Sequence, residues 1–155
     1  GRSACEAFIN AGWAVRMFTR SMSRQSDQPE IERHFGNGMD ATALIEAAHG
    51  CDVIVNALNV PYQYWERDLP KLTEAVLHAA KATGATIMLP GNIYNYGANM
   101  PAVLTEDTPH LPTTRKGQMR EDMEEAYAVA ADDSVQTIIL RGGDFIEQFT
   151  FHHTL

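Results

Sequence analysis

The sequence has little cysteine, little positive charge and no long apolar run. Its two cysteines, Cys5 and Cys51, stand in apolar segments with no ligand partner nearby, which favours buried free thiols in a reducing compartment over a disulfide. A net charge of −8 argues against a nucleic-acid partner. No apolar run approaches the roughly 20 residues that span a bilayer, and the first residues lack the layout of a signal peptide. These absences predict a cytoplasmic protein without a membrane or nucleic-acid partner.

Apolar strands alternate with amphipathic helices along the 155 residues. Apolar runs predict buried strands at residues 13–19, 51–57, 85–89 and 135–140, with a weaker strand at 33–36. Helical spacing predicts helices at residues 4–11, 68–83 and 116–131, and another between the cap Asp40 and the closing Gly50. The polar stretch 21–30 is expected to be a loop. This order predicts an α/β fold, a three-layer sandwich with a mostly parallel sheet.

A ligand of such a sheet lies beyond the carboxyl ends of the strands. The loops that follow the strands are therefore predicted to line the site, and they are residues 19–21, 36–40, 56–65, 90–97 and 141–147.

Three segments carry a resemblance to a known family: GNIYNYG at 91–97, EDTPHLPTTRKGQMREDME at 106–124 and LRGGDF at 140–145. On these segments the chain resembles the extended short-chain dehydrogenases, which include nucleotide-sugar epimerases and dehydratases, and it is most similar to their atypical members. The resemblance covers essentially the whole chain. It implies a partial NAD(P)-binding Rossmann domain over residues 1–155, without its first strand and without the substrate domain.

The family's glycine fingerprint, G-x-x-G-x-x-G, ends the first strand and opens the first helix. Its last glycine typically lies eleven residues before the glycine that closes this helix, and Gly1 and Gly12 have that spacing. The resemblance therefore implies that Gly1 and Arg2 belong to the cofactor site, where backbone N–H groups hold the pyrophosphate. The alternative is that Gly1 is only the first residue of the chain.

The residues after the strand at 13–19 predict the type of cofactor. NAD enzymes place an acid there for the ribose 2′-hydroxyl, whereas an arginine accommodates the 2′-phosphate of NADP. Thr19, Arg20 and Ser21 include no acid, and Arg24 adds a second cation. We therefore predict NADP, with NAD as the second choice; the other interpretation of Arg20 is a solvated loop cation.

Further cofactor contacts are implied at the ends of the later strands. Asn37 falls where the family has an aspartate that contacts the adenine amine, whereas Asp40 is better explained as a helix cap. The remaining positions lie beside the cofactor ribose or the nicotinamide, and they are Asn56, Ala57, Leu58, Pro90, Gly91 and Gly143.

The catalytic positions depart from the family's Ser or Thr and its Tyr-x-x-x-Lys, a spacing that this chain lacks. The alignment puts Asn92 at the Ser position, Lys116 at the Tyr position and Arg120 at the Lys position. Arg120 is expected to bind the nicotinamide ribose, and Lys116, one helical turn away, to donate a proton. Tyr94 and Tyr96 are further candidates for the acid. The alternative is that Lys116 and Arg120 are surface cations of a charged helix.

The aromatic tract at 61–65 leaves two interpretations open, a wall over the nicotinamide or substrate, and packing beneath another domain. For the whole protein we predict an NADP-dependent oxidoreductase or epimerase/dehydratase-like enzyme that acts on a small molecule. The altered catalytic set keeps a non-catalytic NADP(H)-binding sensor as an alternative, and a flavin reductase as a weaker one.

Homodimers are common in the family and use the two helices predicted at 68–83 and 116–131. A charged run in the second helix weakens that expectation here, and its members are Arg120, Glu121, Asp122, Glu124 and Glu125. The adjacent His152 and His153 have no third ligand in the sequence, so we expect no metal site.

Overall fold

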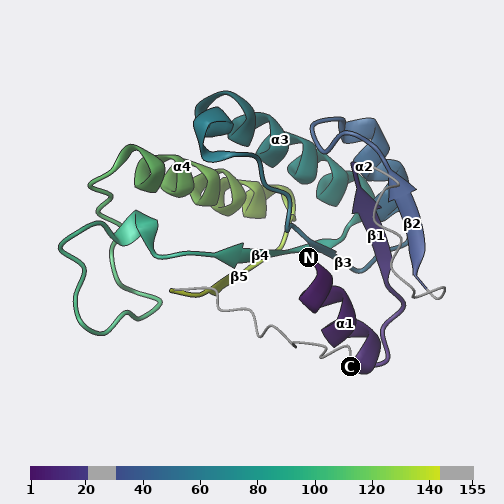
Figure 1. Cartoon of the computed structure of the whole chain (residues 1–155), viewed down its shortest axis with the longest axis horizontal. Helices are drawn as coiled ribbons and strands as arrows, with labels where there is room; N and C mark the ends of the chain where they lie inside the picture. The colour runs from purple at the N-terminus through teal and green to yellow at the C-terminus, as the bar shows by residue number, and fades with distance from the viewer. Residues whose placement is uncertain (21–30, 144–155) are drawn as a thin grey trace, which may run out of the picture.

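The computed structural model of the protein describes residues 1–20 and 31–143 (Figure 1). The predicted loop at 21–30, with Ser21 and Arg24, lies outside the described residues, as do His152 and His153. In chain order the helices and strands are α1 (Arg2–Asn10), β1 (Arg16–Thr19), β2 (Glu32–Phe35), α2 (Ala41–Ala48), β3 (Val53–Val55), α3 (Trp65–Thr83), β4 (Thr86–Gly91), α4 (Arg115–Ala130) and β5 (Thr137–Arg141). Three 3-10 turns join them, η1 (Tyr62–Tyr64), η2 (Tyr94–Tyr96) and η3 (Ala131–Asp133).

The strands pair in parallel in two groups, β1–β2 and β3–β4–β5. Val53 of β3 lies opposite Thr86 of β4, and Gly91 at the end of β4 lies opposite Arg141. Within the described residues no ladder joins β1 to β3. The predicted α/β class with a parallel sheet is confirmed, since all of the described strand pairs are parallel and helices α3 and α4 connect β3 to β4 and β4 to β5.

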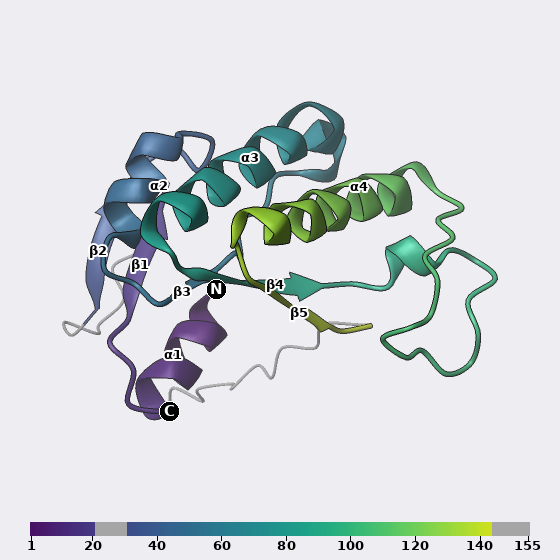
Figure 2. The same ribbon diagram turned by 180° about the vertical axis from the view of Figure 1, so that it is seen from behind.

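Helices lie on both sides of the strands. Figures 1 and 2 show α2, α3 and α4 along one side and α1 on the other. The apolar core forms where α3 and α4 cover β4, and its least exposed side chains include Trp65, Val76, Ile87 and Tyr127. Because β4 is covered in this way, its carboxyl end and the loop after it are held in a fixed position.

Local signals explain where the helices begin and end. The Asp40 carboxylate accepts hydrogen bonds from the backbone N–H groups of Thr42 (3.0 Å) and Ala43 (3.3 Å), as expected of a cap for α2. Gly84 ends α3 with a left-handed φ of 74°. Helix α3 begins at Trp65, three residues before the predicted start, because η1 runs directly into it and buries the indole.

Both cysteines are free and half-buried, so they are less buried than the sequence predicted. None of the helices in the described ranges combines the length and the apolar composition needed to cross a bilayer.

Candidate functional site

A cavity of about 200 Å³ opens at the carboxyl ends of β3 and β4. It brings together six of the residues predicted for the cofactor or the chemistry, namely Gly1, Asn56, Ala57, Leu58, Pro90 and Arg120. Thr73 of α3 and Met123 of α4 add to its wall. The cavity therefore lies at the edge of the sheet where a ligand was expected.

Helix α1 points its N-terminus at this cavity. A side chain placed on Gly1 would come within 3.9 Å of the Cβ atom of Ala57, which follows β3. The first N–H groups of a helix lack intrahelical partners and carry partial positive charge, so they attract anions. The start of α1 therefore offers N–H groups to an anion bound in the cavity.

Asn56 forms part of the floor of the cavity and is held by two hydrogen bonds. Its Nδ2 donates to the Tyr127 hydroxyl at 2.7 Å, and its Oδ1 accepts from the Leu58 N–H at 3.3 Å. Burial raises the pKa of Tyr127 to about 12. This hydroxyl therefore keeps its proton at neutral pH and serves to fix Asn56.

Arg120 reaches the cavity from α4 with unsatisfied donors. Its guanidinium carbon lies 4.7 Å from the centre of the Trp65 ring, and burial lowers the pKa of Arg120 although Glu124 opposes that change. The Nε atom is buried and has no hydrogen-bond partner among the described residues, and Nη1 makes only a long contact with Met123 Sδ (3.9 Å). A buried N–H group without an acceptor is costly, so the surroundings of Arg120 fit a ligand that carries hydrogen-bond acceptors.

Lys116 lies at the surface one turn before Arg120, outside the lining of the cavity. Its Nζ atom is 4.0 Å from the centre of the exposed Tyr62 ring, which itself lies 4.8 Å from the Trp65 ring. Trp65 belongs to the apolar core of the described chain, whereas Tyr62 in η1 is exposed beside Lys116. The two interpretations of the aromatic tract, a wall over the nicotinamide or substrate and packing beneath another domain, both stay predictions.

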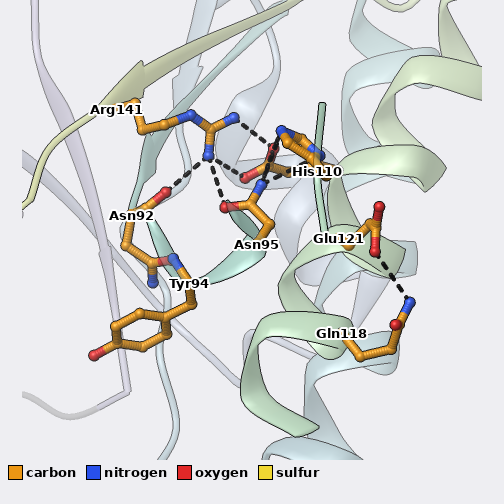
Figure 3. A network of polar contacts seen from close by, with 8 residues as sticks. Asn92, Tyr94, Asn95, His110, Gln118, Glu121 and Arg141 are labelled. Atoms are coloured by element: carbon orange, nitrogen blue, oxygen red, sulfur yellow. Dashed lines mark hydrogen bonds and ion pairs between the residues drawn. The ribbon is translucent and has the colours of Figure 1, made fainter. Parts of the chain in front are cut away.

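A buried polar network behind the cavity joins β5, α4 and the loop after β4 (Figure 3). Arg141 forms a two-pronged ion pair with Glu124 (3.0 and 2.7 Å) and donates to the Asn95 side chain (3.1 Å). Asn95 in turn donates to Glu124 at 2.9 Å and contacts the His110 ring. The network is closed by charge-assisted bonds, which hold the loop in place.

Asn95 and His110 were missed by the sequence prediction. Asn95 is fully buried between two tyrosines in a short 3-10 turn, and His110 meets it from 15 residues away. No periodicity or spacing marks such a pair, because its partners come from separate loops.

Asn92 and Tyr96 belong to the loop after β4 and are not among the residues that line the cavity. Asn92 accepts the Tyr94 N–H with its Oδ1 (3.0 Å) and the Arg141 guanidinium with its backbone oxygen (2.8 Å). The Tyr96 ring is buried edge-on to His110, with Arg141 over its face. Tyr96 therefore does not line the cavity described above.

The other predicted cofactor residues lie around the same edge of the sheet. Thr19 ends β1, and Arg20 follows it exposed to solvent. The Asn37 side-chain oxygen accepts the Met39 N–H at 3.1 Å. Gly91 is buried at the end of β4, and a side chain on Gly143 would meet no atom within 4 Å. Arg2 begins α1.

The charged run of α4 is a correction to the sequence prediction. Glu124 is only 6% exposed and pairs with Arg141, and Arg120 turns toward Trp65. These two residues face inward because each finds an aromatic or ionic partner there. In the described ranges no group of three or more His, Cys, Asp or Glu side chains lies close enough to hold a metal ion.

The parallel sheet, its helical crossovers and the cavity at the carboxyl ends of the strands define a Rossmann-like α/β protein. Within that class the chain has the short-chain dehydrogenase/reductase fold of the NAD-dependent epimerase/dehydratase type, as the sequence resemblance implied.

Comparison with solved structures supports this assignment of the fold. A short-chain dehydrogenase/reductase superfamily protein from Agrobacterium tumefaciens with bound NAD matches with a TM-score of 0.69 and 25% identity, over 91% of this chain and 45% of its own. UDP-N-acetylglucosamine 4-epimerase from Bacillus cereus matches with a TM-score of 0.75 and 18% identity, over 91% and 50%. UDP-glucose 4-epimerase from Brucella ovis in complex with NAD gives 0.73 and 17%, over 88% and 46%.

The chain therefore spans about half the length of the solved structures it matches. No family model matches the sequence, and no curated protein matches it either.

Proposed function

We propose that the protein is an NADP(H)-dependent oxidoreductase, related in chemistry to the nucleotide-sugar epimerases and dehydratases and acting on a small molecule. The observation that carries this proposal is Arg120, whose Nε atom is buried without a hydrogen-bond partner among the described residues, beside a cavity at the carboxyl ends of the strands. Similar solved structures hold NAD, which supports a nicotinamide cofactor for this fold.

In this proposal, different residues around the cavity bind different parts of the cofactor. The N-terminus of α1 would take the pyrophosphate, Arg20 the 2′-phosphate, and Asn37 the adenine amine. Arg120 would donate to the hydroxyls of the nicotinamide ribose, and Pro90 and Gly91 at the end of β4 would lie beside the nicotinamide. When bound, the nicotinamide supplies or accepts a hydride.

Asn92 and Lys116 are proposed to flank the reacting carbon, at the family's Ser and Tyr positions. Lys116 would place a positive charge beside an oxygen that becomes negative during hydride transfer. A cytoplasmic location and a homodimer remain predictions for the whole protein.

Calorimetric titration of the full-length protein with NADPH and NADH tests the proposal. NADPH is expected to bind more tightly than NADH, and Arg20→Glu should reverse that order by removing the cation for the 2′-phosphate. Arg120→Met should weaken both cofactors at least about tenfold, a loss of ~1.4 kcal/mol. Arg67→Met, which removes an exposed arginine paired with Asp68, is the matched control. Absence of binding heat with both cofactors would contradict the proposal.

A non-catalytic NADP(H) sensor is the second candidate, favoured by one observation. Asn92 and Tyr96, two of the four predicted catalytic residues, are engaged in holding the loop after β4. A sensor would bind NADPH without turnover on sugar nucleotides, aldehydes or quinones, and a panel of these substrates separates the two candidates.

A further inference from the structure

The reaction proposed above lacks an evident proton donor. A carbonyl that receives a hydride also needs a proton, and tyrosine supplies it in the family that the chain resembles. All five tyrosines of this chain lie in the described ranges, and none is followed by lysine at the fourth position. If a tyrosine serves here, it must meet its lysine in space.

Burial separates the candidates. Tyr96 and Tyr127 are 5% and 1% exposed, and both are occupied in packing or hydrogen bonding. Tyr64 is exposed but lies under Arg67, whose guanidinium is paired with Asp68. Tyr62 and Tyr94 remain.

Tyr62 is the tyrosine with a lysine against it. The ammonium of Lys116 lies 4.0 Å from the centre of the Tyr62 ring. Tyr62 belongs to η1 and Lys116 to α4, so the two residues are 54 positions apart in the sequence. The Tyr62 ring also lies 4.8 Å from the Trp65 ring, and the Arg120 guanidinium lies 4.7 Å from the centre of the same Trp65 ring. Tyr62 is thus connected to the cavity arginine through Trp65.

The surroundings hold Tyr62 in this position. Its ring packs on Trp65, and the Trp65 indole N–H donates to the backbone oxygen of Val60 at 2.9 Å. An ion pair between Glu66 and Arg115 ties the start of α3 to the start of α4. The Tyr62–Lys116 contact therefore does not depend on two free surface side chains.

We propose that Tyr62 is the general acid/base of this protein and that Lys116 is the cation beside it, so that a Tyr–Lys pair absent from the sequence is assembled between η1 and α4. The inference rests on the proposed oxidoreductase function. Carbonyl compounds that are reduced to alcohols are the substrate class that requires such a group.

The step balances with one hydride and one proton. With a reduced nicotinamide bound, the carbonyl carbon would receive a hydride from it. The C=O π electrons move to the oxygen, a new O–H bond forms there, and the O–H bond of Tyr62 breaks. The Tyr62 phenolate then faces the Lys116 ammonium and recovers its proton from solvent through Lys116.

Kinetics of the full-length protein test Tyr62 first. Tyr62→Phe keeps the ring over which Lys116 lies and removes only the hydroxyl, so kcat should fall about 100-fold while the calorimetric Kd for NADPH stays within about twofold. Tyr64→Phe is the matched control, an exposed ring beside a cation from the same turn, and should leave kcat unchanged. Retention of kcat in Tyr62→Phe, or the same loss in Tyr94→Phe alone, would overturn the assignment.

Nitration by tetranitromethane provides a second readout without cofactor or turnover. The reagent modifies exposed tyrosine rings, and Lys116→Met replaces the ammonium that lies over the Tyr62 ring with an uncharged side chain. The rate of Tyr62 nitration should change at least about threefold in Lys116→Met while that of Tyr64 does not change, as peptide mass spectrometry would show. Equal rates at Tyr62 in both proteins would overturn the role of Lys116.

The two proposals fail in different ways. Missing NADPH binding in calorimetry overturns the oxidoreductase function itself. NADPH binding without reduction of any aldehyde, ketone or keto-sugar nucleotide overturns the oxidoreductase in favour of the sensor. Reduction that survives in Tyr62→Phe overturns only the role of Tyr62 as an acid.

Discussion

Arg16 shows how one side chain can join two elements. From β1 its guanidinium donates to the backbone oxygens of Ala47 (2.8 Å) and His49 (2.9 Å) at the end of α2, and to Glu32 of β2 (2.9 Å). The hydrogen bonds from His34 and then from Arg16 hold the pKa of Glu32 below its usual value. Helix carbonyls that would otherwise need water are satisfied by this arginine.

Arg16→Met should therefore lower the free energy of unfolding by about 1–3 kcal/mol, because it leaves two helix carbonyls without a donor. The midpoint of urea unfolding measures this change. Glu32→Gln removes only an exposed carboxylate and should shift the midpoint much less. An equal shift in both variants would show that the carbonyl contacts contribute little.

At the residue scale, the sequence predicted which strand ends would meet. Gly1, Asn56 and Pro90 line one cavity, because strand ends converge in a parallel sheet, and their role in cofactor binding stays a prediction. Arg120 and Glu124 were also counted in the charged run that weakened the expectation of a homodimer. Their inward direction depends on Trp65 and Arg141, which lie far away in sequence and leave no local pattern.

At the scale of elements, the loop between β4 and α4 is shaped by two glycines. Gly97 has a φ of 73°, and a Cβ atom there would collide with the backbone oxygen of Leu111. A Cβ atom on Gly117, in the first turn of α4, would collide with the backbone oxygen of Tyr94. The loop can lie against α4 only because both side chains are absent.

Gly97→Ala should destabilise the protein by at least about 2–3 kcal/mol, since a left-handed conformation and a backbone collision act together. Thermal unfolding followed by circular dichroism measures the loss. Gly12→Ala is the control, because Gly12 also has a positive φ, 85°, but has no atom within 4 Å of its Cβ position. The prediction is contradicted when the two variants melt at the same temperature.

Regular elements were predictable and this loop was not. The predicted strand at 33–36 corresponds to β2 and the predicted helix at 116–131 to α4. The strand at 13–19 is shorter, beginning at Arg16, because Trp13 and Ala14 are exposed. The fold of the segment from 92 to 112 depends on buried hydrogen bonds to other elements, which sequence spacing does not encode.

On the scale of the whole molecule, burial of Tyr127 couples stability to alkaline pH. The folded state holds the Tyr127 proton up to about pH 12, whereas an unfolded tyrosine releases it near pH 10. A pKa raised on folding means that this contribution to stability is full below pH 10 and is lost as the pH rises toward 12.

Chemical denaturation at pH 8 to 11.5 should therefore show a decline in unfolding free energy of up to about 2–3 kcal/mol from this residue. Tyr127→Phe should be less stable at pH 8, because Asn56 loses its acceptor, and should show a smaller decline. Tyr64→Phe, which removes an exposed phenol, should keep the full decline. Parallel curves for Tyr127→Phe and the unmodified protein would refute the linkage.

Trp65 can also serve as an intrinsic fluorescence probe of the cavity. The chain has two tryptophans, and Trp13→Phe would remove the exposed one while keeping an aromatic ring beside Phe8. The remaining indole, that of Trp65, lies against the Arg120 guanidinium of α4 and against the Tyr62 ring of η1. A ligand that draws Arg120 toward the cavity would change the emission of this single indole, so that occupancy can be followed by intrinsic light emission without any label.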